Sequence, residues 1–284
     1  MEFWVIQFFN GLSYAALLFL LGGGLTLIFG VMRVINIAQG SFFMVGGYIS
    51  YSIISLTGNF YLAILMACLA IGLLGMIIER FALRRLTGAN LRNMLATMGI
   101  ALFLQDSSLL IWGGDPLSLS VPDFLSGTVK IGDLYFPALR IFMIGEATLI
   151  FIVLMLFQRK TRLGAMVRAS IDNPETAEGL GINVPLVRMG VFGLGALVTA
   201  FGGVTGCAFM SIYPGLDFEM LVFAFVVVIL GGMGSIPGAF IGAIIVGLMD
   251  NFGKALFPEL SYFTVFAPMA LMLAIRPMGL FGKG

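Results

Sequence analysis

The sequence contains no histidine, which excludes most of the catalytic and metal sites that a soluble enzyme would use. Histidine is the commonest general base and metal ligand in proteins, so no Ser-His-Asp set, Cys-His pair or zinc motif can be assembled within this chain. The Walker A motif G-x-x-x-x-G-K-[ST] is also missing. We therefore expect no cofactor on this chain, neither ATP nor Mg²⁺, and an enzyme is the least favoured class of function.

Charged residues are scarce as well. They make up 10% of the 284 residues, against 60% hydrophobic residues and a mean hydropathy of +1.08. A soluble domain carries about 25% charged residues, so this composition excludes a soluble fold and requires lipid around the surplus apolar surface. The net charge of +1 indicates no nucleic-acid partner. Cysteine is limited to Cys68 and Cys207, and their spacing sets no disulfide pairing.

The sequence has long apolar runs in place of charge. A membrane-spanning helix needs about 20 apolar residues. Nine runs approach or exceed that length, at about 5–31, 36–56, 60–79, 94–112, 139–157, 187–212, 219–232, 238–253 and 261–275. We predict one domain, 1–284, with an all-α fold: a polytopic transmembrane helical bundle of about 8–10 spans lying in a lipid bilayer. The seventh and eighth runs are short, so they form either two spans or a re-entrant pair.

The distribution of Lys and Arg predicts the orientation of the chain. Basic residues gather at 80–92, at 158–188 and at the C-terminal end (Arg276 and Lys283), and all three clusters fall on one side of the membrane. The positive-inside rule makes that side cytoplasmic, together with the C-terminus. The N-terminus and the acidic 113–138 loop then lie outside. Two short β-prone stretches around Gly132-Asp133 predict a hairpin in this loop.

Two polar groups interrupt the apolar runs early in the chain. The first places amides, a hydroxyl and glycines at the start of the second run: Asn36, Gln39, Gly40, Ser41 and Gly46. In hydrocarbon such groups need partners, so they either hydrogen-bond between helices or line a path or gate at the cytoplasmic end. The second is Asp106, which falls around the middle of the fourth run. An acid inside the membrane is costly and indicates a functional site, although a polar patch near the outer end or a partner's basic residue would also account for it.

A glycine-rich turn separates the two short apolar runs late in the chain. Gly231, Gly232, Gly234 and Ser235 precede a proline and a further glycine. Short segments interrupted by glycine and proline point to a substrate path near the midplane. A tight cytoplasmic turn is the other interpretation, with the adjacent backbone facing the path.

The long cytoplasmic segment, 158–188, has a pattern that predicts two short helices joined by a turn. Asp172 or Asn173 can cap a helix, Pro174 suits its first turn, and Glu175 complements the positive end of the helix dipole. Gly179 or Gly181 can end it. A merely solvated loop has no need of this structure, so we predict a docking surface for another protein, formed by Arg168, Asp172, Asn173, Pro174, Glu175, Glu178 and Gly181.

Four stretches resemble the permease subunit of branched-chain amino acid (Liv-type) ABC importers. Residues 36–40 (Asn-Ile-Ala-Gln-Gly) are similar to the family's N-x-A-H-G, with Gln39 where histidine is common, and 230–238 are similar to its L-G-G-x-G-S-x-x-G. Glu79-Arg80 followed by 95–99 is similar to its E-R…A-T-x-G, and 163–185 to its coupling segment. The resemblance spans about residues 20 to 280.

The resemblance implies partners and a mechanism. It implies a second, homologous permease subunit or a second copy, two ATP-binding cassette subunits that bind ATP and Mg²⁺, and a periplasmic or extracellular solute-binding protein. It also implies the cytoplasmic (inner) membrane of a bacterium as the location. The solutes of this family are branched-chain or hydrophobic amino acids, or related amides, urea and aromatic acids. A secondary transporter or a passive channel for a small solute is the alternative.

Overall fold

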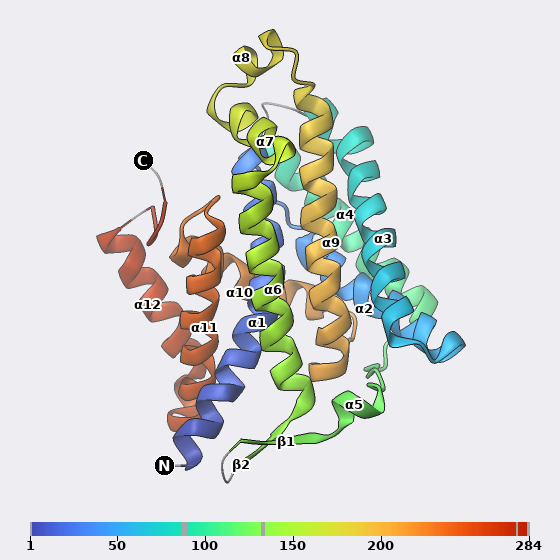
Figure 1. Ribbon diagram of the computed structural model, residues 1–284, viewed down its shortest axis with the longest axis vertical. Helices are drawn as coiled ribbons and strands as arrows, with labels where there is room; N and C mark the ends of the chain where they lie inside the picture. The colour runs from blue at the N-terminus through green and yellow to red at the C-terminus, as the bar shows by residue number, and fades with distance from the viewer. Residues whose placement is uncertain (1, 87–89, 132–133, 277, 283–284) are drawn as a thin grey trace.

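The computed structural model describes residues 2–86, 90–131, 134–276 and 278–282. The chain forms a bundle whose long helices run between two opposite ends of the molecule (Figure 1). Within the described residues, six helices are long and apolar enough to cross a membrane: α1 (Glu2–Met32), α3 with its extension (Phe60–Leu86), α4 (Asn90–Trp112), α6 (Ala138–Lys160), α9 (Val184–Met210) and α11 (Ile236–Leu256). This arrangement confirms the predicted polytopic all-α bundle.

Three shorter apolar helices complete the bundle. They are α2 (Gln39–Thr57), α10 (Leu216–Gly231) and α12 (Ser261–Ile275). The seventh predicted run therefore corresponds to a 16-residue helix, α10, and the eighth to α11, a helix of 21 residues. A rise of about 1.5 Å per residue makes α10 too short to cross a bilayer core of about 30 Å, whereas α11 is long enough.

Small elements cover the two ends of the bundle. The predicted hairpin is confirmed: β1 (Thr128–Ile131) pairs antiparallel with β2 (Leu134–Pro137), and Gly132-Asp133 lies outside the described residues. It stands at the same end as the N-terminus and the one-turn helix α5 (Asp123–Ser126), as Figure 1 shows. The opposite end carries α7 (Arg162–Asp172) and α8 (Pro174–Gly179).

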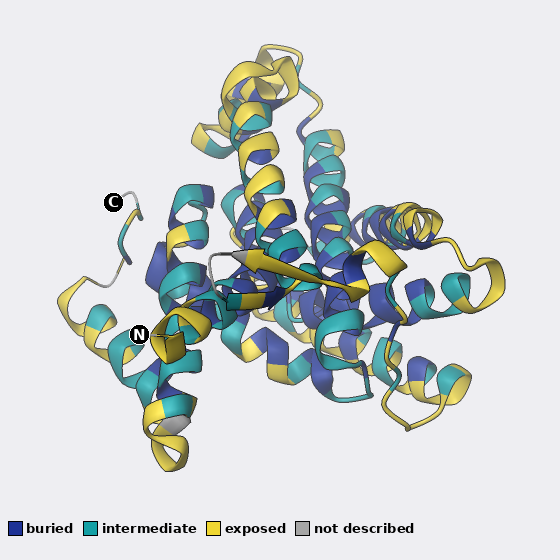
Figure 2. Ribbon diagram, turned by 60° about the horizontal axis from the view of Figure 1, so that its bottom comes forward, coloured by how far each residue is buried: buried dark blue, intermediate teal, exposed yellow. Residues whose placement is uncertain are grey.

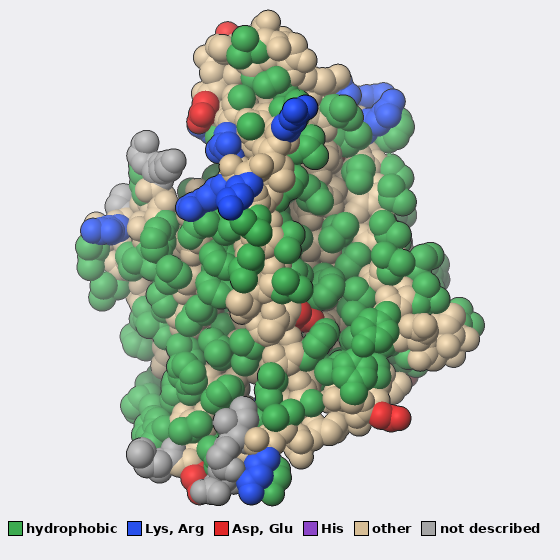
Figure 3. Space-filling view, in the orientation of Figure 1, with side chains coloured by type: hydrophobic (Ala, Val, Ile, Leu, Met, Phe, Trp, Pro, Cys, Tyr) green, Lys and Arg blue, Asp and Glu red, His purple; other side chains and the backbone are tan. Residues whose placement is uncertain are grey.

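Positive charge is concentrated at one of the two ends of the bundle. In Figure 3 the Lys and Arg side chains of the visible face gather mainly toward the end with α7 and α8. The C-terminal segment also lies in the half of the molecule that carries α7 (Figure 1), although Lys283 is outside the described residues. The basic clusters that predicted the orientation thus occupy one end of the bundle.

The core centres on α1, which packs against α6, α9, α10 and α11. Its residues from Ser13 to Ile28 are buried, because it is hydrophobic all round and neighbours surround it. Figure 2 shows this buried centre in dark blue and the exposed outer helix faces in yellow. Only four residues of α4 and four of α6 are buried, so these helices face lipid or another subunit.

Glycines set the closest helix contacts of the bundle. A Cβ at Gly46 would lie 2.9 Å from the Cα of Ala200, and one at Gly203 would collide with the backbone oxygen of Phe43. Small residues let membrane helices approach closely, and here they bring α2 against α9. Cys68 and Cys207 are both buried and free.

Candidate functional site

The chain is unwound between α1 and α2, and polar side chains hold the start of α2 in place. Gln39, the first residue of α2, donates from its Nε2 to the carbonyl oxygen of Gly195 at 3.3 Å and to the hydroxyl of Thr199 on α9. The Nδ2 of Asn36 donates to the Oε1 of Gln39 at 3.0 Å. Gly24 on α1 faces the same point, where any side chain would meet Gln39 and Thr199. Gln39 therefore fixes the start of α2 to α9.

The start of α10 contacts α2 at the residues that follow Gln39. The Oγ of Ser41 donates to the Oδ2 of Asp217 at 2.8 Å and lies 3.4 Å from the carbonyl oxygen of Ala101 on α4. Gly40 lies against the backbone of Asp217 so closely that a Cβ would collide with its carbonyl oxygen. Ser41 and Asp217 are both buried. We call Asn36, Gln39, Gly40, Ser41, Thr199 and Asp217 the polar joint.

The polar joint lies at mid-depth in the bundle. Ala101 is the twelfth of the 23 residues of α4, and Gly195 is the twelfth of the 27 residues of α9. Both α2 and α10 therefore begin near the middle of the long helices. Irregular backbone at membrane depth is tolerated only where it is buried in protein or lines a wet cavity. The joint satisfies this condition, because its polar residues are buried in protein.

Helices α2 and α4 run parallel from the joint onward, and the residue numbers of their hydrogen-bonded pairs differ by 60 throughout. The backbone N–H of Ile37 donates to the Oγ1 of Thr97 at 3.2 Å. At the C-terminal end of α4, the Nε1 of Trp112 donates to the Oγ of Ser52 at 2.7 Å, and Tyr48 stacks on Trp112. Parallel contact over this length ties the position of α2 to that of α4.

The glycine turn between α10 and α11 is packed on three sides. A Cβ at Gly231 would collide with Gly238, and Gly232 and Gly234 have φ values of +101° and +83°, which favour glycine. A Cβ at Gly234 would lie 3.2 Å from the Cα of Gly30 on α1. Ser235 caps α11 by accepting a hydrogen bond from the backbone N–H of Gly238 at 3.2 Å. The turn is thus locked by close backbone contacts.

Two exposed acids lie at membrane depth, one on α4 and one in the first turn of α10. Asp106 is exposed on α4, six residues before its last residue, Trp112, so it lies about 9 Å from that end. Glu219 is exposed in the first turn of α10, and its Oε2 accepts a hydrogen bond from the hydroxyl of Tyr213 at 3.0 Å. Gln105, beside Asp106, approaches Gly215 at the start of α10. We call Gln105, Asp106, Tyr213 and Glu219 the α4–α10 face.

The acids of the α4–α10 face have no countercharge in the described part of the chain. Neither Asp106 nor Glu219 forms an ion pair there, whereas Asp250 on α11 pairs with Lys254 at 2.6 Å. An ionisable residue inside a membrane usually faces a wet cavity or a partner. The α4–α10 face therefore points to water or to another subunit.

Helices α7 and α8 form the predicted two-helix unit, and the predicted capping residues lie at the ends of α8. The Oδ1 of Asn173 accepts a hydrogen bond from the backbone N–H of Thr176 at 3.0 Å, with Pro174 as the first residue of α8. Helix α8 ends at Gly179, and Gly181 has a φ of +84°. A Cβ at Gly164 would collide with the carbonyl oxygen of Phe157, so α7 packs tightly on the end of α6.

The outer surface of this unit is available to a partner. The seven residues predicted as a docking surface are all exposed, namely Arg168, Asp172, Asn173, Pro174, Glu175, Glu178 and Gly181. Leu163 and Leu180 add apolar area beside them, with exposed fractions of 60% and 77%. The buried side of the unit holds Val167 and Ala177. A rigid unit with this mixture of charges and exposed leucines is suited to protein contact.

The residues predicted for a path or gate separate into three places. Asn36, Gln39, Gly40 and Ser41 are buried in the polar joint, and Gly46 packs against Ala200. Asp106 is exposed on the α4–α10 face. The third place is the glycine turn, with Gly231, Gly232, Gly234 and Ser235.

Sequence reasoning missed four residues of these sites. Thr199 and Asp217 complete the polar joint, and Tyr213 and Glu219 complete the α4–α10 face. A signal for Asp217 and Glu219 was present: both acids lie within four residues after Pro214-Gly215, at the start of an apolar run. No signal marked Thr199, because one threonine in an apolar helix is ordinary.

Comparison with known proteins places the chain among membrane permeases. Residues 7–275 match the family model described as branched-chain amino acid transport system / permease component. The high-affinity branched-chain amino acid transport system permease protein BraD of Pseudomonas aeruginosa is 30% identical over 98% of this chain and 95% of its own length. LivH of Escherichia coli K12, the permease protein of such a system, has the same identity and coverage.

More distant relatives include a permease for another solute. The ribose import permease protein RbsC of Escherichia coli K12 is 25% identical over 95% of this chain and 84% of its own length. No solved structure gives a significant match to the chain.

Proposed function

The chain belongs to the family of branched-chain amino acid transport system permease components, and from this premise we propose that its α4–α10 face lines one half of the membrane path of an ATP-driven importer. A homologous permease subunit, or a second copy of this chain, supplies the other half. The family assignment replaces the secondary transporter and the passive channel as interpretations of the sequence.

The observation that carries this proposal is the exposure of Glu219 and Asp106 at membrane depth. An Asp facing lipid at the centre of a helix costs about 2.5–3.5 kcal/mol on insertion scales. A water-filled path or a polar partner surface removes most of this cost. Since both acids are exposed and have no cationic partner among the described residues, a path bounded by a second subunit accounts for them.

The polar joint is proposed to act as the gate hinge behind this face. It holds the first turn of α10, where Glu219 lies two residues after Asp217. Because α2 and α10 both begin at the joint, a small rotation there moves Glu219 without unfolding a long helix. The packed glycine turn at the other end of α10 is the second fixed point of this motion, so Gly231, Gly232, Gly234 and Ser235 set the position of the gate rather than touch the solute.

Energy is proposed to enter through α7 and α8. Two ATP-binding cassette subunits bind ATP and Mg²⁺ and contact the exposed residues of this unit, among them Arg168, Glu175 and Glu178. Helix α7 packs on α1, α6 and α9, and α9 carries Gly195 and Thr199 of the joint contacts. Movement of the unit therefore has a direct mechanical route to the polar joint.

We propose amino acids with hydrophobic side chains as the solutes. The relatives BraD and LivH are named for branched-chain amino acids. The carboxylates of Glu219 and Asp106 complement the α-ammonium group that every such solute carries. The apolar helix surface around them is suited to an aliphatic side chain.

The remaining partners and the orientation follow from the two ends of the bundle. The end with the hairpin and α5 presents Phe124 and Tyr135, both exposed, to an extracytoplasmic solute-binding protein. The basic end with α7 and α8 faces the cytoplasm, as the positive-inside rule requires, and the C-terminus faces the cytoplasm too. The membrane is the bacterial cytoplasmic membrane.

Uptake into proteoliposomes by the assembled importer tests this function. Glu219→Gln removes the charge that meets the ammonium group, and the loss of a charge-assisted hydrogen bond is expected to reduce leucine uptake about tenfold. Glu259→Gln, an exposed acid after α11 and outside the face, is the matched control. Equal uptake by wild type and Glu219→Gln would show that this face does not line the path.

A further inference from the structure

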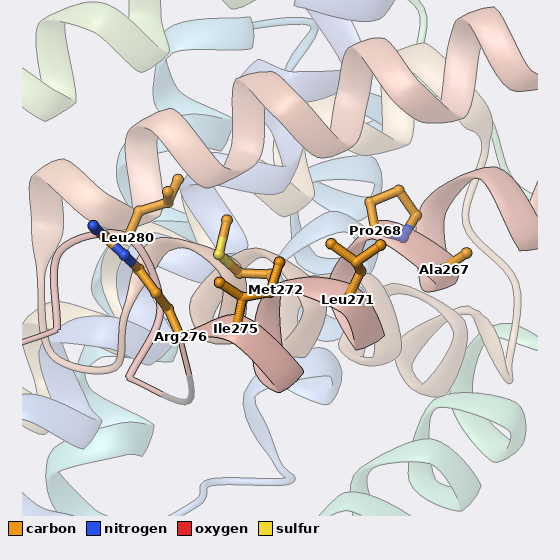
Figure 4. Close-up of a pocket in the computed structure, with 7 residues that line it drawn as sticks. All are labelled: Ala267, Pro268, Leu271, Met272, Ile275, Arg276 and Leu280. Atoms are coloured by element: carbon orange, nitrogen blue, oxygen red, sulfur yellow. The ribbon is translucent and has the colours of Figure 1, made fainter.

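An apolar groove lies on the outside of the bundle, beside α12. It is formed along α12 and closed on one side by Leu280 of the C-terminal segment, with a volume of about 520 Å³ (Figure 4). That volume lies within the range of small-molecule sites. Its α12 lining follows one helix face, because residues three to four apart are neighbours on a helix: Ala267, Pro268, Leu271, Met272 and Ile275.

One end of the groove carries a cation. Arg276 lines the groove directly after the last residue of α12, and Figure 4 shows its side chain beside Leu280. Its side chain is exposed and makes no hydrogen bond or ion pair within the described part of the chain. An unpaired guanidinium at the mouth of an apolar groove is complementary to a ligand with an anionic head and a hydrocarbon tail.

The position of the groove selects the class of ligand. Leu271 and Ile275 are exposed by 62% and 69%, so the groove is open to the hydrocarbon around the bundle. Arg276 directly follows α12, whose C-terminal end lies in the half of the molecule that carries α7 (Figure 1), where the basic residues gather (Figure 3). In a bilayer this is the level of the lipid head groups, where long basic side chains reach the interface.

We propose that this groove is a binding site for an anionic phospholipid. One acyl chain lies along the α12 face from Pro268 to Ile275, and the phosphate accepts hydrogen bonds from the guanidinium of Arg276. Lipid binding at this site does not depend on the solute path, so this proposal is independent of the function proposed above.

The wall formed by Leu280 connects this site to the rest of the bundle. The backbone N–H groups of Leu280 and Phe281 donate to the carbonyl oxygens of Leu230 and Gly231 at 3.0 Å each. These oxygens end α10 and have no further turn of helix to bond. A lipid held between α12 and Leu280 therefore stabilises the segment that closes the end of α10.

The test measures which lipids stay with the full importer after purification. The complex is equilibrated with mixed micelles holding equal amounts of phosphatidylglycerol and phosphatidylcholine, and retained lipid is counted by native mass spectrometry. The wild type is expected to retain phosphatidylglycerol in preference to phosphatidylcholine. Arg276→Gln is expected to lower that preference about fivefold, which is the effect of one basic residue near an anionic lipid surface, and Arg276→Lys is expected to keep most of it.

Two further variants separate the groove from general effects of charge and folding. Arg85→Gln removes another exposed cation, in the segment after α3, and is expected to leave the preference unchanged. Ala267→Phe fills the groove and is expected to abolish retention, while the melting temperature in lipid-free detergent stays near that of the wild type.

Three outcomes would overturn the proposal. The first is an equal preference in wild type and Arg276→Gln, and the second is an equal loss in Arg85→Gln. In the third, Arg276→Gln and Ala267→Phe lose a partner subunit while lipid retention is unchanged, and the groove is then a protein interface.

Discussion

The Oγ of Ser41 donates a hydrogen bond of 2.8 Å to the Oδ2 of Asp217, across 176 residues of sequence. This bond joins the first turn of α2 to the first turn of α10 at mid-depth in the bundle. Both residues are buried, so neither has bulk water as an alternative partner. The starts of the two short helices are therefore coupled, and the coupling has consequences that experiments can measure.

Replacement of Ser41 by alanine leaves the buried carboxyl group of Asp217 without its side-chain donor. A buried polar group that loses its partner costs about 1–3 kcal/mol, so Ser41→Ala is expected to lower the melting temperature of the detergent-purified chain. Ser55→Ala is the matched control, because Ser55 is exposed on the same helix and its hydroxyl donates only to the backbone carbonyl oxygen of Ser52, one turn earlier. An unchanged melting temperature for Ser41→Ala would contradict the proposed strength of the joint.

Replacement of Gly40 by alanine places a Cβ against the carbonyl oxygen of Asp217. The backbones of α2 and α10 must then separate, and overpacking of this kind typically costs about 1–3 kcal/mol. We expect Gly40→Ala to reduce both folded yield and transport. Gly99→Ala on α4 is the control, because a Cβ at Gly99 meets nothing within 4 Å. The account of the joint fails if the two variants behave alike.

Replacement of residues 172–178 by a Gly/Ser stretch removes α8 and leaves the membrane helices intact. We expect ATP hydrolysis by the partner subunits to continue without solute movement, because the helices no longer receive the motion. The measurements are the ratio of solute transported to ATP hydrolysed in proteoliposomes and the amount of chain in the membrane. A normal ratio would show that another segment transmits the motion.

The α8 cap offers a finer test of the same unit. Asn173→Ala removes the acceptor for the backbone N–H of Thr176 and is expected to cost α8 about 1 kcal/mol. Asn173→Asp retains an acceptor and is expected to keep the coupling ratio near that of the wild type. If Asn173→Asp fails as badly as Asn173→Ala, the amide itself contacts a partner and the cap is not the reason.

Local rules of sequence were sufficient for the parts of the fold that local interactions determine. Asn173 and Pro174 predicted the start of α8, and the β-prone stretches predicted the hairpin, because caps and turns depend on residues a few positions apart. The apolar runs predicted the long helices for a similar reason, since the thickness of the bilayer core fixes their length.

The sequence did not reveal that α2 and α10 begin side by side at mid-depth. That arrangement depends on contacts between distant residues, such as Gln39 with Thr199 and Gly40 with Asp217. A run of apolar residues gives the length of a helix but not the depth at which it begins. The same limit explains why Asp217 and Glu219, two residues apart, could not be assigned in advance to the interior and to the exposed face.

The central claim is that the α4–α10 face lines a path that opens alternately to the two sides of the membrane. Its most direct test is the reaction of Glu219→Cys with a membrane-impermeant thiol reagent, in vesicles that hold the assembled importer. Cys68 and Cys207 are buried, which keeps background labelling low. Leu149→Cys, on the exposed surface of α6, is the control and is expected to stay unlabelled in lipid.

We predict that Glu219→Cys is labelled from one side of the membrane without ATP and from the other side when ATP is trapped on the partner subunits. Labelling that ATP does not change, or no labelling from either side, would contradict the claim.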